Sequence, residues 1–271
     1  MVLGKGFLRT SLVAGRTAIT RAQATNPLKL LCPQRTPNAA WVYVATFGGG
    51  LVAGDHVDLD VEIAAGTSCI LTSQASTKVY KSPFGKLAQQ TTNATVGSGA
   101  LLVIAPDPIT CFAEASYQQY QRLHLEPGAN LVFVDWLTSG RRARNECWKF
   151  SRYASRIDIT CDQGPIFLDS ILLDPADGPL ESPFRLGRFH CLALLVILGP
   201  DYQDVTSAIL EEISQQPIDP GSSLIQTASQ ISHGVVVRII GVETETVGRL
   251  LQGKLEFLSE RMGGGPWSRK W

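Results

Sequence analysis

VDLDVEI, residues 57–63, alternates apolar and acidic side chains without interruption. In an extended chain its apolar residues would all face one side and its acidic residues the other, which is the pattern of a half-buried β-strand. The small residues that follow end in Gly66 and are typical of a tight turn. An apolar run then predicts a second strand over residues 68–73. The decisive unit is therefore a strand, a turn that ends in glycine, and another strand.

The same unit recurs twice further along the chain. TTNATVGSGALLVIA, residues 91–105, and YQRLHLEPGANLVFV, residues 120–134, each contain an alternating strand, a turn and an apolar strand. Their turn glycines, Gly66, Gly99 and Gly128, are 33 and 29 residues apart. Similar units at such a spacing favour stacked β coils or layered sheets, in which each unit buries a face on the next. A plain antiparallel sandwich with similar hairpins is the alternative.

Helical patterns come late in the chain. Residues 202–216 place apolar side chains on one stripe and end at a proline, and residues 246–262 do the same and end at three glycines. Residues 233–242 between them predict one more strand, whereas residues 175–187 are rich in proline and glycine and predict a loop. The sequence thus predicts a mainly β protein with two C-terminal helices.

Charge and composition exclude several classes of protein. The 271 residues contain 24 basic and 24 acidic side chains, so no global field would hold nucleic acid or an anionic membrane. No run of 18 apolar residues predicts a transmembrane helix. The six cysteines form no C-x-x-C pair, and we interpret them as small apolar residues in a reducing compartment, the cytoplasm.

The N-terminal segment allows two interpretations. Residues 1–54 contain no acidic residue but six basic ones. An acid-poor, arginine-bearing start is typical of an organelle transit peptide, and an opening strand with a basic outer side explains it equally well.

Glycines dominate FGGGLVAGD, residues 47–55. A phosphate-binding loop would need a lysine directly after the glycines and a helix behind them, and neither follows here. We therefore expect a place where two backbones cross and only glycine fits.

Two polar segments are candidates for binding. His56, Asp58, Asp60 and Glu62 share one side of a strand and could hold a divalent ion, although such a row is far more often solvent-exposed. TSQASTKVYKS, residues 72–82, could present hydroxyls and lysines to a partner, or be an exposed edge protected by lysines.

Isolated carboxylates are the sharpest candidates. Asp135 follows the apolar run LVFV, and Asp169 lies within the apolar run GPIFLDSILL. A buried carboxylate needs a partner, so each is either fixed in a hydrogen-bond network or functional. Glu146 and the nearby arginines, Arg141 among them, favour a structural salt bridge, with a polar passage for an ion as the alternative.

No catalytic signature is present. The four histidines lie outside every G-x-S-x-G, H-E-x-x-H or H-x-H motif, and no cysteine lies in a nucleophile motif. We predict that the protein is not an enzyme. A polysaccharide-acting enzyme on a β-solenoid would need clustered carboxylates and stacked aromatic residues, which the sequence does not show.

Five strings together resemble one family. GGGLVAGD, LTSQASTKVYKS, APDPITCFAEASY, VDWLTSGRRA and GPIFLDSILL, in this order and spacing, resemble the UreD (UreH) urease accessory proteins, most closely their plant and other eukaryotic branch. The resemblance is strong from Gly15 to Asp174. Because residues 15–31 resemble the first strand of the family, residues 1–14 are a possible extension and residues 15–271 a single UreD-like domain, which disfavours the transit peptide.

The resemblance implies a fold and a role. The fold would be a β-superhelix of stacked strands with two helices towards the C-terminus, without catalytic activity. The protein would bind UreF, recruit the GTPase UreG and dock on apo-urease, and it would be homodimeric within the UreD–UreF–UreG complex. Nickel would pass through it in transit, with no tightly held cofactor. The alternative is a metal-independent interaction scaffold on the same fold.

The resemblance also implies roles for individual residues. Oxygen ligands that hold an ion weakly would suit a passage, since tight ligands would trap the ion. The residues expected to line the nickel passage are Asp55, Thr77, Asp135 and Asp169. The residues expected to hold a partner or the motif's structure are Gly48, Gly49, Gly50, Gly54, Gln74, Lys78, Tyr80, Arg141 and Glu146.

Overall fold

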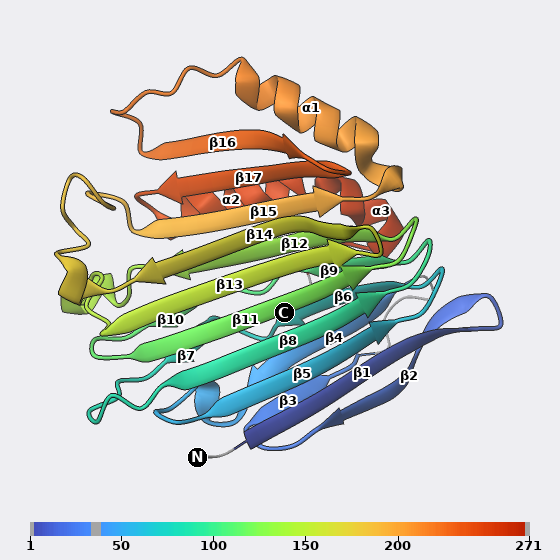
Figure 1. The fold of residues 1–271 in the computed structure, drawn as a ribbon, viewed down its shortest axis with the longest axis horizontal. Helices are drawn as coiled ribbons and strands as arrows, with labels where there is room; N and C mark the ends of the chain where they lie inside the picture. Colours follow the sequence, from blue (N-terminus) through green and yellow to red (C-terminus); the bar gives the residue numbers. More distant parts are fainter. Residues whose placement is uncertain (1–2, 34–38, 269–271) are drawn as a thin grey trace.

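The computed structural model describes residues 3–33 and 39–268, which form two β-sheets and three α-helices (Figure 1). The seven-stranded sheet has the order β14-β13-β11-β8-β5-β1-β2. The ten-stranded sheet has the order β16-β17-β15-β12-β9-β6-β4-β3; in addition β10 pairs with β12, and β7 pairs with β10. The strands of the seven-stranded sheet are β1 (Leu3–Val13), β2 (Arg16–Ala24), β5 (His56–Ile63), β8 (Ala88–Val96), β11 (Ser116–Leu125), β13 (Arg152–Cys161) and β14 (Gly164–Leu173). The strands of the ten-stranded sheet are β3 (Leu28–Leu31), β4 (Ala40–Thr46), β6 (Ser68–Ser73), β7 (Thr77–Val79), β9 (Leu101–Ile104), β10 (Ile109–Cys111), β12 (Asn130–Thr138), β15 (Cys191–Leu198), β16 (Leu224–Ile231) and β17 (Gly234–Gly241). The helices are α1 (Gln203–Ser214), α2 (Thr244–Lys254) and α3 (Ser259–Met262).

The chain coils between the two sheets as a β-solenoid of about four turns. β5, β8 and β11 each cross through a short turn to β6, β9 and β12 in the other sheet, and successive coils pair in parallel. The crossing turns also stack, because the Gly66 N–H donates to the Ser98 carbonyl (3.0 Å) and the Gly99 N–H to the Gly128 carbonyl (3.2 Å). The predicted stacked coils are thus confirmed, since an antiparallel sandwich would not pair these strands in parallel.

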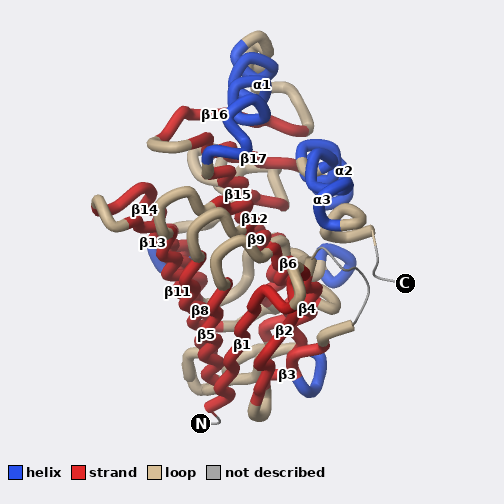
Figure 2. The backbone as a smooth tube through the Cα atoms, turned by 90° about the vertical axis from the view of Figure 1, so that its right-hand side faces the viewer, coloured by secondary structure: helices blue, strands red, loops and turns tan. Residues whose placement is uncertain are grey.

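Two hydrophobic cores follow from this arrangement. One fills the space between the sheets, and the other lies between the ten-stranded sheet and the helices, which cover one side of the molecule (Figure 2). Every residue of β12 is buried because that strand has a core on each side. The Trp41 indole N–H donates to the Met262 carbonyl (3.1 Å) and ties the sheet to α3.

The predicted C-terminal helices are present, with one correction. α1 agrees with the helix expected over residues 202–216. The helix expected over residues 246–262 is divided, because the 3-10 turn Glu256–Leu258 separates α2 from α3. Its apolar side chains still lie on one side, since Val247, Leu251 and Met262 are all buried in the second core.

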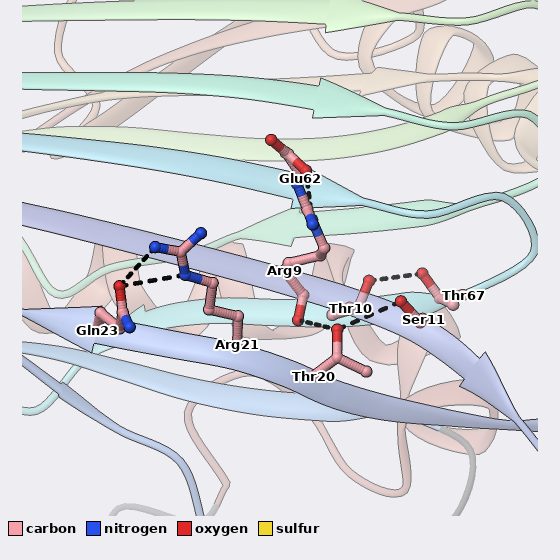
Figure 3. Close-up of polar contacts among 8 residues, drawn as sticks. All are labelled: Arg9, Thr10, Ser11, Thr20, Arg21, Gln23, Glu62 and Thr67. Atoms are coloured by element: carbon pink, nitrogen blue, oxygen red, sulfur yellow. Dashed lines mark hydrogen bonds and ion pairs between the residues drawn. The ribbon is translucent and has the colours of Figure 1, made fainter.

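The first strand differs from the expectation. The described part of residues 1–14 is not an extension in front of the fold but β1, which pairs in parallel with β5 along eight residues. Figure 3 shows two contacts that fix it: the ion pair between Arg9 and Glu62 (2.5 Å) and the buried hydrogen bond between Thr10 and Thr67 (2.8 Å). Residues 15–31 therefore contain the second strand. Residues 1–2 lie outside the described part, and the single domain over residues 15–271 stays a prediction.

None of the helices in the described ranges is long and apolar enough to cross a membrane. All six cysteines are free thiols, and Cys69, Cys111 and Cys191 are buried. Burial raises the pKa of all three, that of Cys191 to about 12, as expected of small apolar residues.

Candidate functional site

Two cavities between the sheets meet at Asp135. The first, of about 130 Å³, is lined by a mixture of apolar and polar side chains from both sheets. The second, of about 220 Å³, lies towards β14 and β17 and has a largely apolar lining. Asp135 lines both cavities, and its position between them is here called their junction. The polar lining residues of the first cavity include Ser73, Thr77, Gln90, Thr92, Gln119 and Gln121.

Strand alternation places Asp135 in the core. Leu131, Phe133 and Leu137 of β12 lie in the core between the sheets, and Asp135 shares their side of the strand. Its carboxylate accepts hydrogen bonds from two residues of the opposite sheet, Gln119 Nε2 (2.8 Å) and Ser155 Oγ (3.1 Å). No basic residue stabilises its charge within the described structure. Burial therefore raises the pKa of Asp135, and the hydrogen bonds partly oppose that shift.

The polar network around Asp135 extends along the seven-stranded sheet. Ser155 Oγ donates to the Asp135 carboxylate (3.1 Å) and lies 2.9 Å from Gln119 Nε2. The Tyr117 hydroxyl donates to Gln119 Oε1 (3.3 Å), and the Tyr153 hydroxyl lies 3.3 Å from Gln119 Nε2. This network holds the Gln119 amide in place and gives the junction several neutral oxygen atoms.

Sequence reasoning missed the glutamines of this network. Gln119 and Gln121 occupy the buried side of β11, together with Leu123 and Leu125. The sequence does contain a signal for these two glutamines. Their amides lie at alternate positions, on the same side of the strand as the apolar residues that follow.

Asp169 lies at the second cavity in an ion pair. Its carboxylate is 2.9 Å from Arg238 Nη2, and the Asp169 side chain is only 13% exposed. The charge of Asp169 adds to the rise in the pKa of Asp135, so the two carboxylates act on one another. Arg238 itself is half exposed at the surface of β17.

The structure brings three of the four expected passage residues together and leaves one apart. Thr77 lines the first cavity, Asp135 joins the two, and Asp169 lines the second. Asp55 is buried but lines neither cavity. Its carboxylate accepts the Val52 backbone N–H (2.9 Å) and holds the turn before β5.

The glycine-rich segment is a backbone crossing, as predicted. A Cβ atom on Gly50 would lie 2.4 Å from the Lys78 carbonyl oxygen, which accepts the Leu51 N–H (2.8 Å). Only glycine allows that approach. The Tyr80 hydroxyl donates to the Gly48 carbonyl (3.3 Å), so the lysine and tyrosine of the polar segment fix the crossing. Gly48, Gly49 and Gly54 all adopt positive φ.

Gln74 is exposed at the rim of the first cavity.

Arg141 and Glu146 form the structural ion pair that the sequence predicted. Arg141 Nε lies 2.8 Å from Glu146 Oε2, and the guanidinium stacks 4.0 Å from the Phe112 ring centroid. Glu146 also accepts the Ala113 N–H (3.2 Å). Chiefly through the hydrogen bond from Arg141, this holds the pKa of Glu146 below its usual range.

We expect Glu146→Gln to lower the free energy of unfolding by about 1 kcal/mol at pH 7, since the neutral amide keeps an acceptor but loses the charge. The contribution of Glu146 is present above the pKa of an unfolded glutamate and is lost as the pH falls through its lowered folded pKa. Urea unfolding at pH 7 and near pH 3 checks this. An equal difference between variant and wild type at both pH values would contradict it.

The polar side of β5, which carries His56, Asp58, Asp60 and Glu62, faces solvent. His56 Nε2 lies 2.9 Å from Asp58, Asn93 donates to Asp60 (2.8 Å), and Glu62 pairs with Arg9. All four residues of the row are partly or fully exposed. Across the described ranges, no group of three His, Cys, Asp or Glu side chains is placed to hold a metal ion.

The chain is similar to urease accessory proteins along its length. The model of the family described as UreD urease accessory protein matches residues 4–271. The urease accessory protein UreD of Sorangium cellulosum (strain So ce56) is 45% identical over 269 residues, which cover 99% of this chain and 84% of that protein. The UreD of Anaeromyxobacter sp. (strain Fw109-5) is 36% identical over 266 residues, covering 98% of this chain and 89% of that protein.

A plant relative is similar to a comparable degree. Urease accessory protein D of Oryza sativa subsp. indica is 35% identical over 290 residues, which cover 97% of this chain and 94% of that protein. The expected resemblance to plant proteins is confirmed, and the Sorangium protein shares a higher identity.

Proposed function

The chain belongs to the UreD family of urease accessory proteins, and it therefore has a role in urease maturation; from that premise we propose that it conducts nickel between its two sheets to apo-urease. UreF would bind the chain and UreG would deliver the nickel. The path would run along the two cavities, past Thr77, Asp135 and Asp169. The cargo enters and leaves, so no resident cofactor is part of the proposal.

One observation carries the proposal: the buried residue Asp135 lines both cavities. A buried acid without a basic partner costs stability, and a packed apolar side chain would serve the fold better. A passing divalent cation supplies the missing positive charge. Nickel conduction would thus give Asp135 a use that packing alone does not.

The chemistry of the lining supports transit rather than storage. The residues that line the first cavity include Thr92, Gln90 and Gln121, whose side chains carry hydroxyl and amide oxygens. Neutral oxygens bind a divalent ion weakly, whereas a cluster of thiolates or imidazoles would hold nickel tightly. A sequence of single weak ligands would let the ion move from one to the next.

The metal-independent scaffold is supported by a different observation. That alternative expects Asp135 and Asp169 to be salt-bridged, and Asp169 does pair with Arg238. Asp135 has no such partner among the described residues, which favours nickel conduction. The further parts of the proposal are a homodimeric UreD–UreF–UreG complex, a cytoplasmic location and the absence of catalysis by this chain.

Reconstitution tests the proposal. Cognate apo-urease, UreF, UreG, GTP and nickel are incubated with and without this chain, and ammonia release from urea is measured. We expect activity only when the chain is present, and recovery of a complex with UreF. Activity that is the same without the chain, together with no such complex, would sink the proposed role.

A further inference from the structure

Charge is separated along the strands although the chain is neutral. The segments that lead into β8, β11 and β13 are residues 78–86, 112–115 and 139–152, and together they are here called the loop ridge. They include the last two residues of β7 and the first residue of β13. The loop ridge contains eight basic residues and only two acidic ones. The crossing turns at the opposite ends of these strands contain no basic residue and include Glu126 and Asp162 (Figure 1). The loop ridge is therefore strongly basic although the molecule as a whole is neutral.

Backbone hydrogen bonds make the loop ridge one continuous surface. The Ser82 N–H donates to the Glu114 carbonyl (2.9 Å), and the Glu114 N–H donates to the Lys149 carbonyl (2.9 Å). The Ser151 N–H then donates to the Ala115 carbonyl (2.8 Å). The three loops are thus stacked in order, and their basic side chains lie on neighbouring layers.

Most basic residues of the loop ridge have no acidic partner. Arg141 pairs with Glu146 and Arg142 with Glu243. No salt bridge occupies the other six within residues 3–33 and 39–268, and all six are exposed. Those six are Lys78, Lys81, Lys86, Arg144, Lys149 and Arg152.

An exposed aromatic side chain stands among these charges. Phe84 is 87% exposed and lies between Lys81 and Lys86. Its turn is fixed by the Gly85 N–H to the Ser82 carbonyl (3.0 Å) and by the Ser82 hydroxyl to the Lys86 carbonyl (2.8 Å). A large apolar ring on a pre-ordered turn loses little entropy on binding, which is the property of an interface anchor.

We propose that the loop ridge docks an acidic protein face that has an apolar pocket for Phe84. The inference rests on the proposed function, which supplies the candidate partners UreF, UreG and apo-urease. Charge complementarity favours an acidic partner and would orient it before contact. The loop ridge adjoins the first cavity, because Thr77 lines that cavity and Lys78 follows it, so a docked partner would lie beside that cavity.

A charge-reversal variant tests the docking surface. The variant carries Lys81→Glu, Lys86→Glu and Lys149→Glu, and its control carries the same charge change at Lys5, Arg16 and Arg249, which are exposed elsewhere. Binding to each of purified UreF, UreG and apo-urease is measured from 50 to 300 mM salt. We expect the ridge variant to weaken binding to one partner at least tenfold and to flatten its salt dependence, while the control stays within twofold.

A second pair of variants tests the anchor. Phe84→Ser should weaken binding to the same partner at least fivefold, whereas Ile218→Ser, at another exposed apolar residue, should not. Unchanged binding of the ridge variant to all three proteins, while urease activation still depends on the chain, would overturn this inference alone. Tighter binding of the wild type to anionic vesicles or RNA than to any of the three would overturn it too. No binding to any of the three would defeat the proposed function with it.

Discussion

Replacing Asp135 by asparagine should lower urease activation at least tenfold while the protein stays folded. Asparagine has nearly the same shape and keeps an oxygen acceptor for Gln119 and Ser155, but it removes the charge of the buried residue that lines both cavities. A tenfold loss corresponds to about 1.4 kcal/mol, a modest value for removing a charged ligand from the path of a divalent ion. Activation is measured in the reconstituted system.

Stability separates this effect from misfolding. Because burial raises the folded pKa of Asp135, its contribution to the free energy of unfolding is full below the unfolded pKa and is lost as the pH rises through the folded value. The neutral asparagine does not have that loss. The free energy of unfolding of the Asp135→Asn variant at pH 7 should therefore lie no more than about 1 kcal/mol below that of the wild type. By the same titration, activation by the wild type should decline as the pH falls and Asp135 becomes protonated.

Asp55→Asn is the matched control, since it makes the same chemical change at a carboxylate that lines neither cavity. It should leave activation within twofold of wild type. Equal losses of activation in both variants, or full activation by the Asp135 variant, would count against a nickel path along Asp135.

Deleting residues 1–14 should prevent stable folding. The deletion removes β1, exposes the edge of β5 along eight paired residues and leaves β2 without its neighbour. It also removes the fully buried Leu8, whose truncation alone costs about 2–5 kcal/mol. We expect the shortened protein to be insoluble, or to unfold in urea with at least about 4 kcal/mol less stability.

Point variants keep this prediction testable if the deletion yields no protein. Leu8→Ala should destabilise by the amount given above, whereas Leu12→Ala, at a residue 51% exposed on the same strand, should cost less than about 0.5 kcal/mol. A shortened protein that unfolds cooperatively at the wild-type urea midpoint would show that β1 contributes nothing to the fold.

The repeated units made the coiled part of the fold predictable. The first strand, β1, was not predicted because its own residues lack the alternating pattern. β5 alternates apolar and acidic residues, so its buried side is evident in the sequence. In β1, the buried positions include Gly4, Gly6 and Thr10, and only Leu8 carries an apolar side chain inward. A Cβ atom at Gly6 would lie 2.4 Å from Leu28, and so close packing, not hydrophobic alternation, selects these residues.

The candidate site was predictable only where a charge interrupts an apolar run. Asp135 and Asp169 were identified in that way, and they line adjoining cavities. The neutral partner Ser155 carries no such signal, and the only signal for Gln119 is that its amide shares the alternate positions of Leu123 and Leu125. The ion pair between Asp169 and Arg238, 69 residues apart, could be found only in the fold.

The most direct test of nickel conduction is transfer in the presence of a chelator. The complex of this chain with UreF and nickel-loaded UreG is mixed with apo-urease in excess external chelator, GTP is added, and nickel bound to urease is counted. An ion that travels between the sheets is shielded from bulk solvent. The account predicts that urease acquires nickel with the wild-type chain and with Asp55→Asn, but not with Asp135→Asn. Equal nickel in urease with the Asp135 variant, or none with the wild type, would contradict it.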